Sequence, residues 1–97
     1  MILRPGTHRL RRATDPNTPF VLDYASVSAS SPTVVRVFVG DTLVEEVYVG
    51  PYSPHTWWAN NPLMTERQIP APGELVTIEV GGGAIVRLES NLLIDES

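Results

Sequence analysis

The sequence predicts an all-β fold, a small antiparallel β-sandwich or barrel-like domain with an extended N-terminal arm and a long loop. Valine recurs through a chain whose apolar share is 42%, and β-branched side chains are enriched in strands. Seven glycines and nine prolines provide the many turns that join short strands. At 97 residues the chain is expected to form one domain with a modest core, which partners or further copies would supplement.

Residues 1–19, MILRPGTHRLRRATDPNTP, are predicted to be an extended basic arm ahead of a β domain at residues 20–97. The segment has no sustained helical or strand period and ends in a DPNTP turn cluster. Every cation of the chain is an arginine, and the arm holds four of the seven with Asp15 as its single acid. Two interpretations of these arginines stay open: a solvated tail, or a clamp on the carboxylates of a neighbour such as another copy of this chain. They are Arg4, Arg9, Arg11 and Arg12.

The β domain is expected to begin with a strand at Phe20, because in FVLDYASVSA the large apolar side chains fall at every second position until SSPT interrupts the pattern. A tight hairpin, TVVRVFVGDTLVEEVYVG, should follow with Gly40 and Asp41 as its two loop residues, since glycine accepts the positive φ that such a turn requires. This register places Arg36 opposite Glu45. It leaves apolar side chains on both faces, so one face should form the core and the other should need a cover or a partner.

Residues 51–72, PYSPHTWWANNPLMTERQIPAP, are predicted to form a long loop. Five prolines exclude a regular central strand or a long helix through most of it, although LMTERQ would allow one helical turn. Loops of this length are commonly functional. Neighbouring residues on extended backbone point in opposite directions, so one of Trp57 and Trp58 is expected to seal the core and the other to serve as an interface anchor beside His55.

The C-terminal third returns to a strand pattern with ELVTIEV, a GGG turn and AIVRLESNLLI. We expect a second hairpin in which Val80 faces Ala84 across the three glycines. The same register pairs Ile78 with Val86 and gives the hairpin one continuous apolar face.

No recognisable catalytic or metal-binding motif is present. The chain has no cysteine, and its two histidines, His8 and His55, do not have the spacing of a metal-binding pair. Glycines 81–83 lead into a strand, whereas a phosphate-binding loop leads into a helix. We therefore expect a protein that is not an enzyme and needs no cofactor or metal.

The net charge of −4 is unfavourable for general nucleic-acid binding, since no basic face remains once the arm is set aside. The first residues lack the apolar run of a signal peptide or a membrane helix, so a protein that stays in the cytoplasm in which it is made is expected.

The arm MILRPGTHRLRR together with the strand segments TVVRVFVGDTLVEEVYVG and ELVTIEVGGGAIVRLES resembles small accessory proteins of tailed-bacteriophage virions, of the capsid decoration (cement) or head-completion type. The resemblance implies a β-sandwich or barrel-like domain that sits on a shell of other virion subunits and stabilises the lattice through an arm that reaches a neighbour. The modest core expected of a small domain separately favours a homo-oligomer. The alternative left open is a carbohydrate- or receptor-binding module that uses the Trp57 and Trp58 loop.

Overall fold

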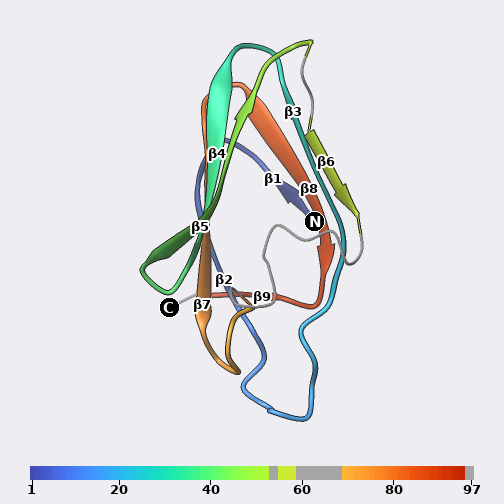
Figure 1. Ribbon diagram of the computed structural model, residues 1–97, viewed down its shortest axis with the longest axis vertical. Coiled ribbons are helices and arrows are strands. Elements are labelled where there is room, and N and C mark those ends of the chain that lie inside the picture. Colours follow the sequence, from blue (N-terminus) through green and yellow to red (C-terminus); the bar gives the residue numbers. More distant parts are fainter. Residues whose placement is uncertain (53–54, 59–68, 96–97) are drawn as a thin grey trace.

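The computed structural model describes residues 1–52, 55–58 and 69–95, except for the side chains of residues 22–24 and 55–58. Two antiparallel sheets pack face to face, as Figure 1 shows in an edge-on view. The prediction of an all-β fold is confirmed. Within the described ranges there is no helix that could cross a lipid bilayer.

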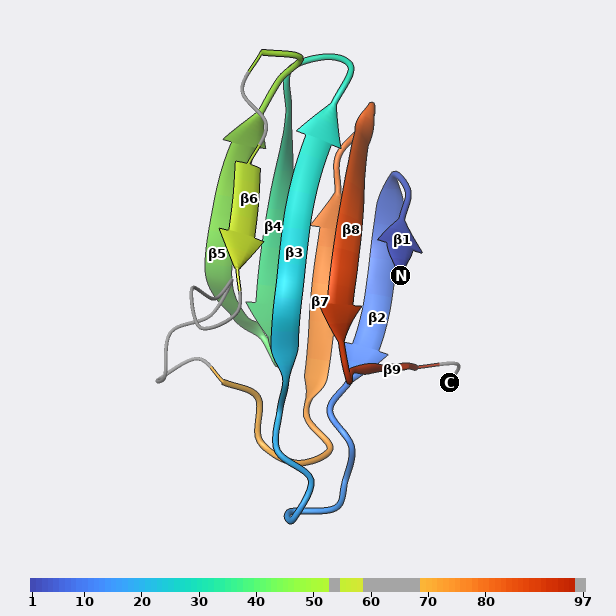
Figure 2. The same ribbon diagram turned by 90° about the vertical axis from the view of Figure 1, so that its right-hand side faces the viewer.

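The first sheet has four strands in the order β1-β8-β3-β6, and the second has five in the order β5-β4-β7-β2-β9. The strands of the first sheet are β1 (Ile2–Leu3), β8 (Ala84–Ser90), β3 (Leu22–Ala29) and β6 (His55–Trp58). Those of the second are β5 (Thr42–Val49), β4 (Thr33–Val39), β7 (Leu75–Val80), β2 (Gly6–Arg11) and β9 (Leu93–Ile94). Figure 2 shows β5 and β6 at one side of the sandwich and β1 and β2 at the other.

The core lies between the sheets and is built mainly from valines at alternate positions. In β7 and β8 every second side chain is buried, which is the period-2 pattern of strands with one face on the core. The most buried positions include Leu10, Val37, Ile78 and Leu88, each at most 2% exposed. Burial of such side chains is worth about 1.5–3 kcal/mol each relative to exposure.

Strands β7 and β8 do not form the expected hairpin. β7 pairs with β4 and β2, whereas β8 pairs with β1 and β3 in the other sheet. The three glycines therefore form an arch that crosses between the sheets, so Ile78 and Val86 belong to different sheets and are both buried in the core between them. The expected apolar face is correct and its pairing is wrong, because side-chain alternation alone does not distinguish a hairpin from an arch.

The β4–β5 hairpin forms with Gly40 at a φ of 58°, but its register differs from the expectation. A bulge leaves Val44 as an extra residue, so Arg36 lies opposite Glu46 and not Glu45. Because side chains alternate with period 2, one inserted residue exchanges the faces of everything after it. Val47 is consequently buried in the core, and Tyr48 points outwards.

The predicted N-terminal arm is part of the sandwich. β2 pairs with β7 along its whole length, and β1 pairs with β8. Leu3 and Leu10 are 4% and 1% exposed. The arm expectation is wrong because β1 is too short to show a period, and because polar residues surround the single buried leucine of β2.

The predicted loop at residues 51–72 contains a strand. β6 pairs with β3 as the outermost strand of its sheet, a position in which neighbouring prolines are tolerated. Residues 59–68, with the expected helical turn at LMTERQ, lie outside the described residues.

Candidate interaction surface

The outer face of the β4–β5 hairpin carries a row of polar side chains that hold one another in place. Arg36 lies opposite Glu46 of β5 and Glu79 of β7 in the register of the sheet. Its Nε donates to Glu46 Oε2 at 2.7 Å, and the hydroxyl of Tyr48 donates to Glu46 Oε1 at 2.6 Å. The carboxylate of Glu46 therefore positions both the guanidinium and the phenol.

These contacts change the protonation equilibria of all three groups. The hydrogen bond from Tyr48, and after it the hydrogen bond from Arg36, lowers the pKa of the Glu46 carboxyl. The bond to Glu46 raises the pKa of the Tyr48 phenol, because ionisation would set a phenolate against a carboxylate. Hydrogen bonding to Glu46 also raises the pKa of Arg36. Near neutral pH the row thus holds a charged pair and a neutral phenol, an arrangement suited to positioning side chains.

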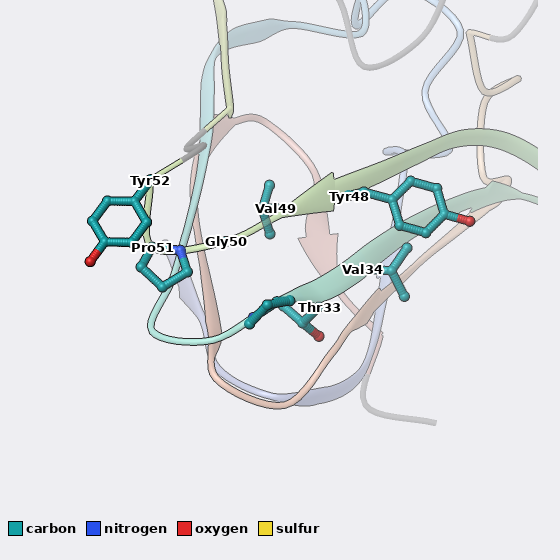
Figure 3. Close-up of a pocket in the computed structure, with 8 residues that line it drawn as sticks. Thr33, Val34, Tyr48, Val49, Gly50, Pro51 and Tyr52 are labelled. Carbon is teal, nitrogen blue, oxygen red and sulfur yellow. The ribbon is translucent and has the colours of Figure 1, made fainter.

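An apolar hollow of about 660 Å³ lies at the end of the hairpin farthest from the Gly40 turn. Figure 3 shows Tyr48 on one side of the hollow and Tyr52 on the other. The remaining lining residues are Pro32, Thr33, Val34, Val49, Gly50 and Pro51. To a ligand this lining offers apolar contact area and the hydrogen-bonding capacity of a few hydroxyls.

The two tyrosines of the hollow are open to solvent. Tyr48 is 72% exposed and Tyr52 is 97% exposed. Grouped exposed apolar side chains commonly mark sites of interaction, and tyrosine is enriched at interfaces, where its ring supplies apolar area and its hydroxyl stays hydrated. Among the described residues there is no group of three or more potential metal ligands.

Two of the arginines assigned to the arm make contacts within the chain. Arg11 donates to the carbonyl of Gly73 at 2.6 Å and forms an ion pair with Asp95 at 3.3 Å. Arg12 donates to the carbonyl oxygens of two loop residues at 2.6 and 3.2 Å. These contacts tie the loops to the end of the sandwich opposite the hollow, and they compete with the expected grip on a neighbour.

Arg4 and Arg9 remain exposed, on the side of the sandwich away from the hairpin. The carbonyl of Arg4 accepts a hydrogen bond from His8 Nε2 at 2.6 Å, and Arg9 lies opposite Thr77 in the sheet. The structure does not bring these two arginines together with Arg11 and Arg12 into one clamp. A role of Arg4 and Arg9 at an interface stays a prediction.

The expected aromatic site falls on β6. The backbone register pairs Trp57 with Ala25, Trp58 with Tyr24 and His55 with Val27. The expectation that one indole faces the core and the other a partner concerns side chains that lie outside the described part of the chain.

The tyrosines of the hollow were missed as a site because the expected register placed Tyr48 on the same face as Val37 and Val39 and left open which face of the hairpin forms the core. A signal was available in VEEVYVGPY, where two tyrosines flank a Gly-Pro step that ends the strand. Its meaning depends on the bulge at Val44, which decides the face on which Tyr48 lies.

Comparisons with protein-family models, with curated proteins and with solved structures found no match to this chain.

Proposed function

We propose that this protein is a non-enzymatic binding module that docks on another protein through its hairpin surface. This surface comprises Val34, Tyr48, Pro51 and Tyr52, which line the hollow. The observation that carries the proposal is the pair of exposed tyrosines on either side of an apolar hollow (Figure 3). Tyrosine supplies large contact area at a low cost in side-chain entropy, and it is frequent among the residues that dominate binding energy.

Preorganisation of the hairpin surface supports the proposal. Tyr48 is already held by Glu46, which is held by Arg36. Pro51 fixes its own φ at the end of the strand. Binding therefore has to order few side chains, which lowers its entropic cost.

The assembly we propose is the capsid lattice of a tailed phage, to which the sequence resemblance points. In that role the protein is a decoration or cement protein that stabilises contacts between shell subunits and performs no turnover. Because residues 1–11 belong to the protein's own sheets, the hairpin surface replaces the arm as the element that touches the lattice.

Photo-crosslinking tests the proposal. A photoreactive phenylalanine analogue replaces Tyr52 in particles assembled with this protein, and Leu93, which is 57% exposed on β9, is replaced in a matched control. We expect one dominant adduct with a shell subunit from position 52 and little from position 93. Unlabelled protein should compete for the adduct, and the variant carrying Tyr48→Ser and Tyr52→Ser should not. Equal crosslinking from both positions would count against the hairpin surface.

Carbohydrate binding is the second candidate, because two exposed aromatic rings beside a hollow also suit stacking against a sugar ring. A titration with a panel of oligosaccharides, followed by the NMR signals of Tyr48 and Tyr52, separates the two functions. A saturable shift that is lost in Tyr48→Ala would favour the sugar. No shift, together with the crosslink to a shell protein, would favour the lattice.

A further inference from the structure

Strand β5 is the longest of the outermost strands in the described part of the sandwich. β5 has eight residues, whereas the other outermost strands have two residues in β1 and in β9 and four in β6. Within the described residues β5 pairs with β4 alone. Among the described residues nothing pairs with the other side of its backbone, whose donors and acceptors could bind an added strand.

The bulge divides this edge into two parts. Val44 interrupts the ladder, and the pairing from Glu45 to Val49 is then regular. These five residues form the continuous part of the edge, and they lead directly to the hollow between Tyr48 and Tyr52. An extended segment laid along them would bring one of its side chains to the hollow.

The charges of this part of the sheet are acidic. Asp41, Glu45 and Glu46 lie on the hairpin with Arg36 as its only cation. Glu46 is paired with Arg36, whereas the side chain of Glu45 makes no ion pair or hydrogen bond with another described residue. Its opposite residue is the buried Val37, so Glu45 lies on the inward side of an edge strand.

An inward charge on an edge strand opposes pairing with a second copy, since antiparallel β5 strands would bring glutamates of both chains together. The same charge favours a strand that carries arginine or lysine at the matching position. The acidic edge thus discriminates between possible occupants.

We propose that the edge from Glu45 to Val49 accepts an extended basic segment of a protein partner as an added β-strand. Backbone hydrogen bonds hold the segment, Glu45 pairs with one of its cations, and the hollow receives an apolar or aromatic side chain. This inference rests on the proposed function and specifies the chemistry of the partner that the hairpin surface binds.

Synthetic peptides test the inference with the intact protein. The probe is Arg-Val-Arg-Val-Arg-Tyr, compared with the same peptide carrying glutamate in place of arginine and with one interrupted by proline. NMR reports backbone amide shifts and hydrogen exchange. We expect the basic peptide to slow amide exchange between Glu45 and Val49, and we expect no such effect from the other two.

Charge substitutions provide the matched variants. Glu45→Gln should weaken binding of the basic peptide by about two- to fivefold, the range of an exposed ion pair. Glu89→Gln, on the exposed face of β8 in the other sheet, should leave binding unchanged. Added salt should weaken binding to the wild-type protein more than binding to Glu45→Gln.

Equal binding of the basic and acidic peptides, or protection confined to β6, would overturn the inference. So would a concentration-dependent dimer of the protein alone with protected β5 amides. The crosslink from position 52 does not depend on strand addition. A crosslink without protection of β5 would therefore overturn the inference and leave the proposed function in place.

Discussion

Tyr48 and Glu46 illustrate how one carboxylate determines the character of a surface. Glu46 accepts hydrogen bonds from both Tyr48 and Arg36, so it keeps a ring with 72% exposure in a defined position. Without the bulge at Val44 the same tyrosine would face the core. The outward position of Tyr48 therefore depends on a backbone bulge four residues earlier in the chain.

Replacing Glu46 by glutamine should lower the pKa of the Tyr48 phenol towards its ordinary value of 10.0. The raised pKa of Tyr48 in the folded protein means that its contribution to stability is present below pH 10.0 and is lost as the pH rises through the raised pKa. The glutamine removes the charge that opposes ionisation. An NMR titration of the Tyr48 ring in the wild type and in Glu46→Gln measures the shift, and identical titration curves would contradict the hydrogen bond.

The hydrogen bond that raises the pKa of Tyr48 lowers the pKa of Glu46, so the two residues affect stability at opposite ends of the pH range. Because the pKa of Glu46 is lowered from its ordinary value of 4.5, the carboxylate contributes its full stabilisation at a pH above 4.5. This contribution is lost as the pH falls through the lowered pKa. Wild-type protein should therefore lose this contribution on acidification, whereas Glu46→Gln, which has no carboxyl at this position, should not.

The glycine arch is the element that converts two neighbouring strands into members of different sheets. Gly81 N donates to the carbonyl of Val34 at 3.0 Å, and Ser30 N donates to the carbonyl of Gly83 at 3.0 Å. The arch is thus attached to β4 of one sheet and to the end of β3 in the other. The backbone at Gly81 is so closely packed that a side chain there would disturb it.

Gly81→Ala should destabilise the protein by about 1–3 kcal/mol, the usual cost of overpacking. A Cβ at Gly81 would clash with Thr33 Oγ1 and would lie 2.6 Å from the backbone oxygen of Val34. Gly82→Ala is the control, since a Cβ there meets nothing within 4 Å, and it should be neutral or stabilise by up to about 1 kcal/mol. Urea denaturation of both variants makes the comparison, and equal stabilities would contradict the arch.

The sandwich as a whole requires its N-terminal strands. β2 lies inside the five-stranded sheet between β7 and β9, and the backbone oxygen of Met1 accepts from Leu88 N at 2.8 Å. The stability of a small domain is about 5–15 kcal/mol in total. Truncating one buried leucine to alanine costs about 2–5 kcal/mol.

Removal of residues 1–11 should therefore unfold the domain. The deletion takes Leu3 and Leu10 from the core and leaves β7 as an edge strand with no neighbour on that side. We expect loss of the near-ultraviolet circular dichroism signal and of a cooperative thermal transition. A truncated chain that still melts cooperatively would restore the interpretation of residues 1–19 as an arm.

By itself the sequence determined the all-β fold class, the turn at Gly40 and the buried faces of β7 and β8. These properties follow from local period-2 alternation and from the backbone freedom of glycine. Ile78 and Val86 are buried whether their strands pair or face each other, so the core of this region could be predicted without knowing the topology.

Only the tertiary structure decided which strands are neighbours and which face Tyr48 occupies. Alternation specifies where a side chain points and leaves open which strand supplies the hydrogen bonds, because pairing partners are distant in sequence. The pairing of β2 with β7 and the arch at Gly81 depend on such non-local pairing. The bulge at Val44 lies in a local hairpin, where apolar side chains on both faces leave the register open. The hairpin surface exists as a candidate site because that bulge exchanges the two faces of β5.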